Sequence, residues 1–161
     1  MRPLCVVDTN VVVSGLVSRA EGAPPQRILN AMLAAKLGFA LSVELLAEYR
    51  GVLLRPGIMA LHGLGEAEVD EILQRLALET VEVDIGWAVE TGAAHPVPIA
   101  VPAGVEPGDE HVARLALALP ASVLITGDRA SAAAMTGACE VRTAAEAQRL
   151  LAPAPSRART E

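Results

Sequence analysis

Two short apolar runs, each followed by an aspartate, are the feature that most limits how this chain can fold. Residues 4–7 are Leu-Cys-Val-Val and precede Asp8, and residues 123–126 are Val-Leu-Ile-Thr and precede Gly127 and Asp128. Runs of this kind, without alternating polar residues, are typical of strands buried on both faces of a parallel sheet. Parallel strands present their carboxyl ends at one edge, so the two aspartates are predicted to meet there if the strands are neighbours.

Segments with helical periodicity lie between the predicted strands. Pro56-Gly57 is expected to end one of these helices, and the proline-rich residues 92–108 are predicted to form a functional loop. The alternation of strands and helices indicates an α/β fold, a three-layer αβα sandwich around a central, mainly parallel sheet. The predicted helices are a turn or two over residues 11–17, then 25–36, 42–54, 66–78, a segment beginning near Asp109, and 143–151. Further strands are predicted at 39–41, 81–83 and 140–142.

Length and composition fit one globular domain. The chain has 161 residues, of which 52% are apolar, so it can form its own core, and an intrinsically disordered protein is excluded. We expect one domain over residues 1–152 and a disordered tail over 153–161. No apolar run is long enough for a signal peptide or a membrane span. The expected location is the cytoplasm, with Cys5 and Cys139 as reduced thiols.

The charge balance excludes binding to nucleic acid through a broadly basic surface. The formal net charge is −6, and only 2% of the residues are aromatic, so stacking of bases on a platform of rings is excluded as well. An acidic protein can still act on nucleic acid at a metal centre, because clustered carboxylates hold a hard cation and make the metal-free protein negative.

Candidate ligands for such a centre come from the predicted sheet edge. Asp8 and Asp128 follow strands, and Asp109 begins a helix. In the helix after the second predicted strand, Glu48 projects about 40° from Val52 of the apolar face, whereas Glu44 projects further into solvent and suits a helix-dipole interaction. Carboxylates gathered at one place repel each other unless a cation lies between them, and oxygen-only ligands favour Mg²⁺ or Mn²⁺. Taken singly, each aspartate also fits an ordinary turn or helix cap.

Four sequence blocks in the same order resemble those of PIN domains, the family named for the PilT N-terminus. The opening block contains the Asp-Thr-Asn tripeptide that ends the first strand of the family, and the second contains the stretch Leu-Ala-Glu-Tyr. Together the blocks cover essentially the whole predicted domain. They are residues 6–15 (VVDTNVVVSG), 41–50 (LSVELLAEYR), 106–112 (EPGDEHV, followed by LALA at 115–118) and 123–128 (VLITGD).

The resemblance implies a metal-dependent ribonuclease that acts as the toxin of a type II toxin–antitoxin pair. The implied catalytic residues and ligands of Mg²⁺ or Mn²⁺ are Asp8, Glu48, Asp109 and Asp128. The expected partners are an RNA substrate, a cognate antitoxin and a second copy of the chain in a homodimer. Two positions depart from the family pattern: Glu106 replaces the usual aspartate of the third block, and Ala130 stands where members often carry another acid.

Three polar residues near the four acids, Asn10, Ser14 and Thr126, are candidates for supporting roles, with ordinary turn or helix-start roles as the alternative. His111 lies about 200° around its helix from Asp109 and is not expected to share a metal with it. Two other functions remain open from the sequence. One is a PIN-like domain that binds RNA or protein but cleaves poorly, and the other is a metal-dependent phosphatase.

Overall fold

In the computed structural model, which describes residues 2–80 and 99–151, three short parallel strands form a central sheet. β1 (Cys5–Val7), β2 (Val123–Ile125) and β3 (Glu140–Arg142) pair in the order β1-β2-β3. Val7 lies opposite Ile125 in this register. Every residue of β1 and β2 is buried, as their unbroken apolar sequences predict. The two strands that precede the aspartates are therefore neighbours and end at the same edge of the sheet.

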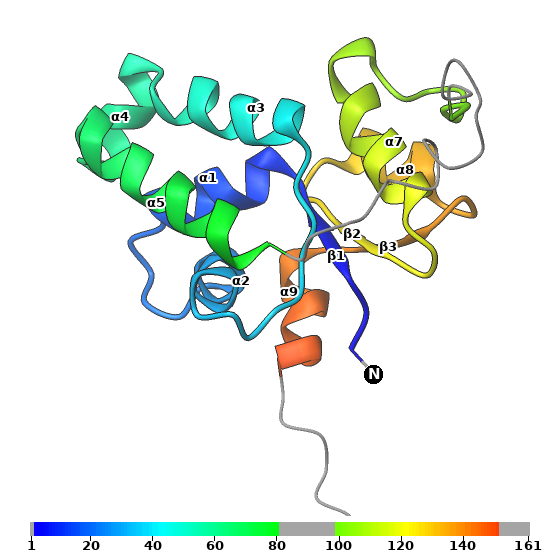
Figure 1. The fold of residues 1–161 in the computed structure, drawn as a ribbon, viewed down its shortest axis with the longest axis horizontal. Coiled ribbons are helices and arrows are strands. Elements are labelled where there is room, and N and C mark those ends of the chain that lie inside the picture. Colours follow the sequence, from blue (N-terminus) through cyan, green and yellow to red (C-terminus); the bar gives the residue numbers. More distant parts are fainter. Residues whose placement is uncertain (1, 81–98, 152–161) are drawn as a thin grey trace, which may run out of the picture.

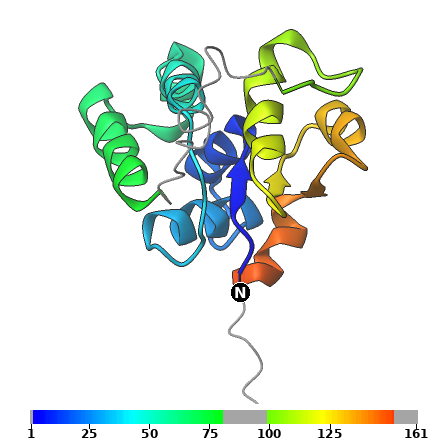
Figure 2. The same cartoon turned by 45° about the vertical axis from the view of Figure 1, so that its right-hand side comes forward.

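Helices on both sides of the sheet complete the α/β sandwich expected from the sequence. Figure 1 and Figure 2 show α3 and α7 together on one side of the molecule and α2 and α9 on the opposite side. α7 packs on β1 and contacts α3, and α9 packs on β3 and contacts α2. The helices are α1 (Thr9–Val17), α2 (Pro24–Leu33), α3 (Val43–Leu53), α4 (Pro56–His62), α5 (Glu66–Glu79), α7 (Glu110–Ala118), α8 (Arg129–Met135) and α9 (Ala144–Ala147), with 3₁₀ turns at Pro107–Asp109 and Gln148–Leu151.

The helix starts follow the capping residues in the sequence. The hydroxyl of Ser42 accepts a hydrogen bond from the Leu45 N–H at the beginning of α3, at 3.1 Å. Thr143 and Glu146 form a capping box at the beginning of α9. In each case a side-chain oxygen satisfies an N–H that has no partner within the helix. These caps confirm where the sequence predicted the two helices to begin.

One local prediction was wrong. Residues 39–41 do not form a strand; Phe39 makes a single bridge with Cys5 beside β1. The helix α3 does end before Pro56-Gly57, as predicted, and Pro56 begins the helix α4, which was not predicted. Proline is favourable in the first turn of a helix, where its missing N–H would have no partner. The predicted strand at 81–83, residues 92–98 of the predicted loop and the predicted tail at 153–161 lie outside the described residues.

The first helix packs closely against the second. A methyl group at Gly15 of α1 would lie 2.9 Å from the Pro25 carbonyl oxygen and 3.0 Å from the Leu29 Cβ of α2. These separations are too short for a real side chain, so glycine allows the two helices to approach. Cys5 is buried and Cys139 is half-buried, and both are free thiols. No described helix has the length and apolar character needed to cross a membrane.

Candidate active site

Asp8 is the residue that joins the sheet to the first helix. It directly follows β1, its N–H donates to the Ile125 carbonyl of β2 at 2.9 Å, and its Oδ1 accepts from the Thr9 N–H at 2.8 Å as the N-cap of α1. The residue is only 7% exposed. The strand pairing and the helix start therefore fix this carboxylate at the carboxyl edge of the sheet.

The second oxygen of Asp8 is held by residues from both strand ends. Asp8 Oδ2 accepts from Thr126 Oγ1 at 2.8 Å and from Asn10 Nδ2 at 3.0 Å. Asn10 Oδ1 in turn accepts from the Gly127 N–H at 2.9 Å. Thr126 Oγ1 accepts from the Asp128 N–H at 3.1 Å. Asn10 and Thr126, both predicted as supporting residues, thus connect Asp8 to the turn that carries Asp128.

Asp109 and Asp128 are brought together through the hydroxyl of Ser131. Ser131 Oγ lies 3.1 Å from Asp109 Oδ2 and 2.9 Å from Asp128 Oδ2. Asp128 is also the N-cap of α8, with its Oδ1 accepting from the Ala130 N–H at 3.0 Å. A serine hydroxyl has one proton to donate, so it can satisfy only one of these two carboxylates at a time.

Glu48 reaches the same region from α3. Its Oε2 accepts a hydrogen bond from the Thr9 hydroxyl, and its Oε1 lies 3.5 Å from His111 Nε2 of α7. His111 Nδ1 is buried and has no hydrogen-bond partner in the described part of the chain. Glu48 is therefore positioned by the residue after Asp8 on one side and by α7 on the other.

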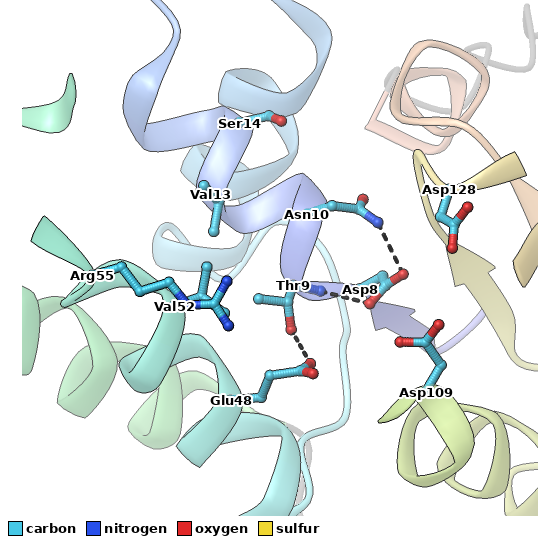
Figure 3. A pocket seen from close by; sticks show the side chains of 10 residues that line it. All are labelled: Asp8, Thr9, Asn10, Val13, Ser14, Glu48, Val52, Arg55, Asp109 and Asp128. Atoms are coloured by element: carbon cyan, nitrogen blue, oxygen red, sulfur yellow. Dashed lines mark hydrogen bonds between the residues drawn. The ribbon is translucent and has the colours of Figure 1, made fainter. Parts of the chain in front are cut away.

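All four predicted acids line one pocket of about 410 Å³ (Figure 3). Asp8 lies near its middle, with Glu48 on one side and Asp109 and Asp128 on the other (Figure 3). Ser14 also lines the pocket, but no hydrogen bond joins it to a carboxylate among the described residues. Glu44, exposed on α3, is not part of the lining. The remaining lining residues are Thr9, Asn10, Val13, Val52 and Arg55.

Two aspartates of the pocket have pKa values shifted from the ordinary value, in opposite directions. Burial raises the pKa of Asp8, and the charges of Asp109 and Glu48 raise it further, against the lowering effect of its hydrogen bonds from Thr126 and the Thr9 N–H. The hydrogen bond from Ser131 and the Ala130 N–H lower the pKa of Asp128. Asp8 therefore gains a proton more readily than an ordinary aspartate, and a nearby cation would oppose that gain.

The donors suit Mg²⁺ or Mn²⁺ in kind, because all four are carboxylates and hard cations prefer oxygen ligands. Across residues 2–80 and 99–151, however, no three Asp, Glu, His or Cys side chains are grouped closely enough to hold a metal ion. In this arrangement the Thr9 hydroxyl hydrogen-bonds to Glu48, and the Ser131 hydroxyl bridges Asp109 and Asp128. Binding a metal through three or more of these acids therefore requires side-chain movements.

Four residues of this site were not predicted from the sequence. Thr9 and Ser131 hydrogen-bond to the acids, His111 contacts Glu48, and Arg55 lines the pocket. Thr9 lies within the Asp-Thr-Asn tripeptide and was open to prediction. Ser131, in an alanine-rich segment without a predicted element, carried no signal.

The positions that depart from the family pattern add no acid to the pocket. Ala130 is exposed, and Glu106 is an exposed residue before the 3₁₀ turn. Neither lines the pocket that holds the four acids.

The family assignment follows from a direct comparison of sequences. The PIN domain family model matches residues 5–130, which span β1 to the beginning of α8 and include all four acids. The chain belongs to the PIN domain family, whose members are generally nucleases. No curated protein matches the chain, and no solved structure does.

Proposed function

We propose that this protein is a metal-dependent ribonuclease that hydrolyses RNA phosphodiesters, with Mg²⁺ or Mn²⁺ as its cofactor. The observation that carries the proposal is the single pocket at the sheet edge, lined by acids from four separate parts of the chain. The proposed ligands and catalytic residues are Asp8, Glu48, Asp109 and Asp128. Only Asp8 among them is buried, so the other three have room to turn toward a cation.

Each side chain has a distinct role in this proposal. When bound, the cation activates a water and neutralises charge on the phosphodiester. Thr126 and Asn10 keep Asp8 aimed into the pocket through their hydrogen bonds to Oδ2. Thr9 fixes Glu48 opposite Asp8. Such hydrogen bonds to a ligating carboxylate orient it before the cation arrives.

A cleavage assay tests this function directly. Purified wild type and Asp8→Asn are incubated with cellular RNA in Mn²⁺, in Mg²⁺ and in chelator. Cleavage by the wild type alone, and only with metal, supports the proposal. Equal cleavage by both proteins, or cleavage in chelator, contradicts it. A chromogenic phosphate monoester in parallel tests the phosphatase alternative.

A binding domain with little cleavage activity is the second candidate. It is favoured by the spacing of the acids, which form no three-ligand group among residues 2–80 and 99–151, and by Ala130 in place of a further acid. Retention of RNA on the wild type without cleavage in Mn²⁺ identifies this second function.

The proposed biological role is that of a cytoplasmic toxin. Growth arrest on expression of the wild type, but not of Asp8→Asn, supports this role, and rescue by the product of a neighbouring reading frame identifies the antitoxin. Gel filtration with light scattering tests the proposed homodimer. The simplest antitoxin contact is an Arg or Lys inserted among the carboxylates, where it supplies the positive charge that a metal would supply.

This antitoxin contact makes metal and antitoxin compete. Saturating Mn²⁺ is expected to weaken antitoxin binding, because both require the same carboxylates. An antitoxin affinity that is equal in Mn²⁺ and in chelator contradicts insertion of a cation, but leaves the nuclease function untouched.

A further inference from the structure

Among the described residues that line the acidic pocket, Arg55 is the one with a cationic side chain. It lies in the short connection between α3 and α4, and its side chain extends over Val52 toward Thr9 (Figure 3). The residue is exposed. Arg50, Arg114 and Arg142 form ion pairs, whereas Arg55 forms none with the residues described. Its guanidinium donors are therefore available to a ligand in the pocket.

The backbone of Arg55 is held firmly by the corner between the two helices. Its N–H donates to the Val52 carbonyl at 3.1 Å, and its carbonyl accepts from the Ile58 and Met59 N–H groups, each at 2.9 Å. His62 Nε2 lies 2.9 Å from the Leu53 carbonyl across the same corner. The guanidinium is thus carried on a rigid part of the fold.

Arg55 lies two residues beyond the helix that carries the predicted ligand Glu48. Glu48 and Val52 are spaced at i and i+4 on one side of α3, which ends at Leu53, and Arg55 lines the pocket together with them. The pocket therefore has a cation at one end, and Asp109 and Asp128 lie at the other end, beyond Asp8 (Figure 3).

The surroundings of Arg55 argue against a role as a permanent partner of these carboxylates. Both Glu48 oxygens already have neighbours, the Thr9 hydroxyl and the His111 ring. Asp109 and Asp128 lie on the far side of Asp8 (Figure 3). Val13 and Val52, which line the pocket on the same side of Asp8 as Arg55 (Figure 3), offer no acceptor. An anion entering from solvent would meet a guanidinium that forms no ion pair with the described residues.

We propose that Arg55 binds a phosphate of the RNA backbone beside the phosphodiester that is cut. This inference rests on the proposed ribonuclease function. A protein with net charge −6 repels RNA, so a local cation is needed where the strand passes the carboxylates. A guanidinium suits this task because its planar fork donates two parallel hydrogen bonds to a phosphate.

The test measures binding of an unstructured single-stranded RNA oligonucleotide in chelator, where the carboxylates hold no metal and cleavage is prevented. Affinity is determined for wild type, Arg55→Gln and Arg55→Lys over a range of salt concentrations. Arg75→Gln is the matched control, because it removes one exposed charge from α5, away from the pocket lining. Melting temperatures establish that all variants are folded.

The affinity for RNA falls as salt increases, and each phosphate contact to a single strand adds about 0.7 to the steepness of log affinity against log salt. Loss of one contact therefore makes this dependence shallower by about 0.7, which corresponds to roughly fivefold weaker binding at 0.1 M salt. Arg55→Gln is expected to show both changes. Arg55→Lys is expected to lose less affinity and to keep nearly the wild-type salt dependence, and Arg75→Gln is expected to keep the affinity and the salt dependence of the wild type. In Mn²⁺, Arg55→Gln is expected to raise KM more than it lowers kcat.

A wild-type salt slope in Arg55→Gln overturns the inference. If Arg55→Gln keeps the wild-type salt dependence of RNA binding but binds Mn²⁺ with altered affinity, Arg55 instead balances the charge of the carboxylates. Failure of the ribonuclease function is seen separately, as absence of cleavage by the wild type in Mn²⁺, and it leaves the comparison of salt slopes in chelator intact.

Discussion

Replacing Ser131 with alanine removes the hydroxyl that joins Asp109 to Asp128 and leaves every carboxylate in place. The two carboxylate oxygens both lie within 3.1 Å of this hydroxyl oxygen, so they are at most about 6 Å apart. At that distance, like charges repel by about 0.7 kcal/mol in water and about 3 kcal/mol at an effective dielectric constant of 20. The pocket is open to solvent, so the smaller value is the better guide.

The expected cost follows from what the hydroxyl does. A hydrogen bond to a charged acceptor contributes about 1.5–3 kcal/mol, and solvent access places this one at the lower end. Alanine recovers about 0.5 kcal/mol through its better helix propensity in α8. Ser131→Ala is therefore expected to lose about 1 kcal/mol of unfolding free energy without metal. The melting temperature falls by about 2–4 °C for a chain of this size.

Metal binding is expected to suffer more than stability. Loss of a residue that orients ligating carboxylates typically weakens metal affinity by about 10-fold or more. Calorimetric titration of Mn²⁺ measures this change, with Ser14→Ala as control, since Ser14 lines the pocket without bonding a carboxylate among the described residues. If Ser131→Ala binds Mn²⁺ as tightly as wild type and melts at the same temperature, the serine does not organise the site.

Three further changes test the same arrangement. Asp8→Asn should abolish cleavage yet stabilise the metal-free protein at neutral pH. Because the pKa of Asp8 is raised in the fold, the wild type regains stability as the pH falls toward 3.8. The difference in unfolding free energy between Asp8→Asn and the wild type, measured in urea, should therefore become smaller at low pH; a larger difference contradicts this. Glu48→Gln should weaken Mn²⁺ binding in calorimetry more than Glu44→Gln does. The opposite order would show that the face of α3 that carries Glu44, and not the one that carries Glu48, turns toward the metal. Tyr49→Phe should cost about 1–3 kcal/mol in thermal unfolding, because it leaves the buried Val7 carbonyl without its hydroxyl donor; an unchanged melting temperature would show that this bond contributes nothing.

The strands β1 and β2 and the four acids were open to prediction because their signals are local. Asp8 stands directly after β1 and Asp128 three residues after the end of β2, and in a parallel sheet these positions determine the edge at which the two aspartates appear. Glu48 required only a helical projection from its apolar neighbours. The structure places all of them in one pocket. Their chemical roles stay predictions for the cleavage and metal-binding experiments.

The remaining features depend on contacts between distant segments. The projection of His111 assumed one continuous helix from Asp109, but Asp109 ends a 3₁₀ turn and α7 begins after it. Its angle of about 200° therefore did not apply across the junction. The contact of His111 with Glu48 needs the packing of α7 against α3. Arg55 is brought to the pocket by a corner between helices whose second member, α4, was not predicted.

The pairing of β1 with β2 has a consequence for how the protein is made. Thr126 holds Asp8 although the two residues are 118 positions apart, and the Thr126 N–H donates to the Arg142 carbonyl of the last strand. At a synthesis rate of about 5–20 residues per second, the ribosome therefore needs roughly ten seconds after Asp8 to produce its partners. Throughout that interval the nascent chain contains the first acid without the pocket around it. Under the proposed ribonuclease function, the nascent protein would in this way stay harmless to the message from which it is being translated.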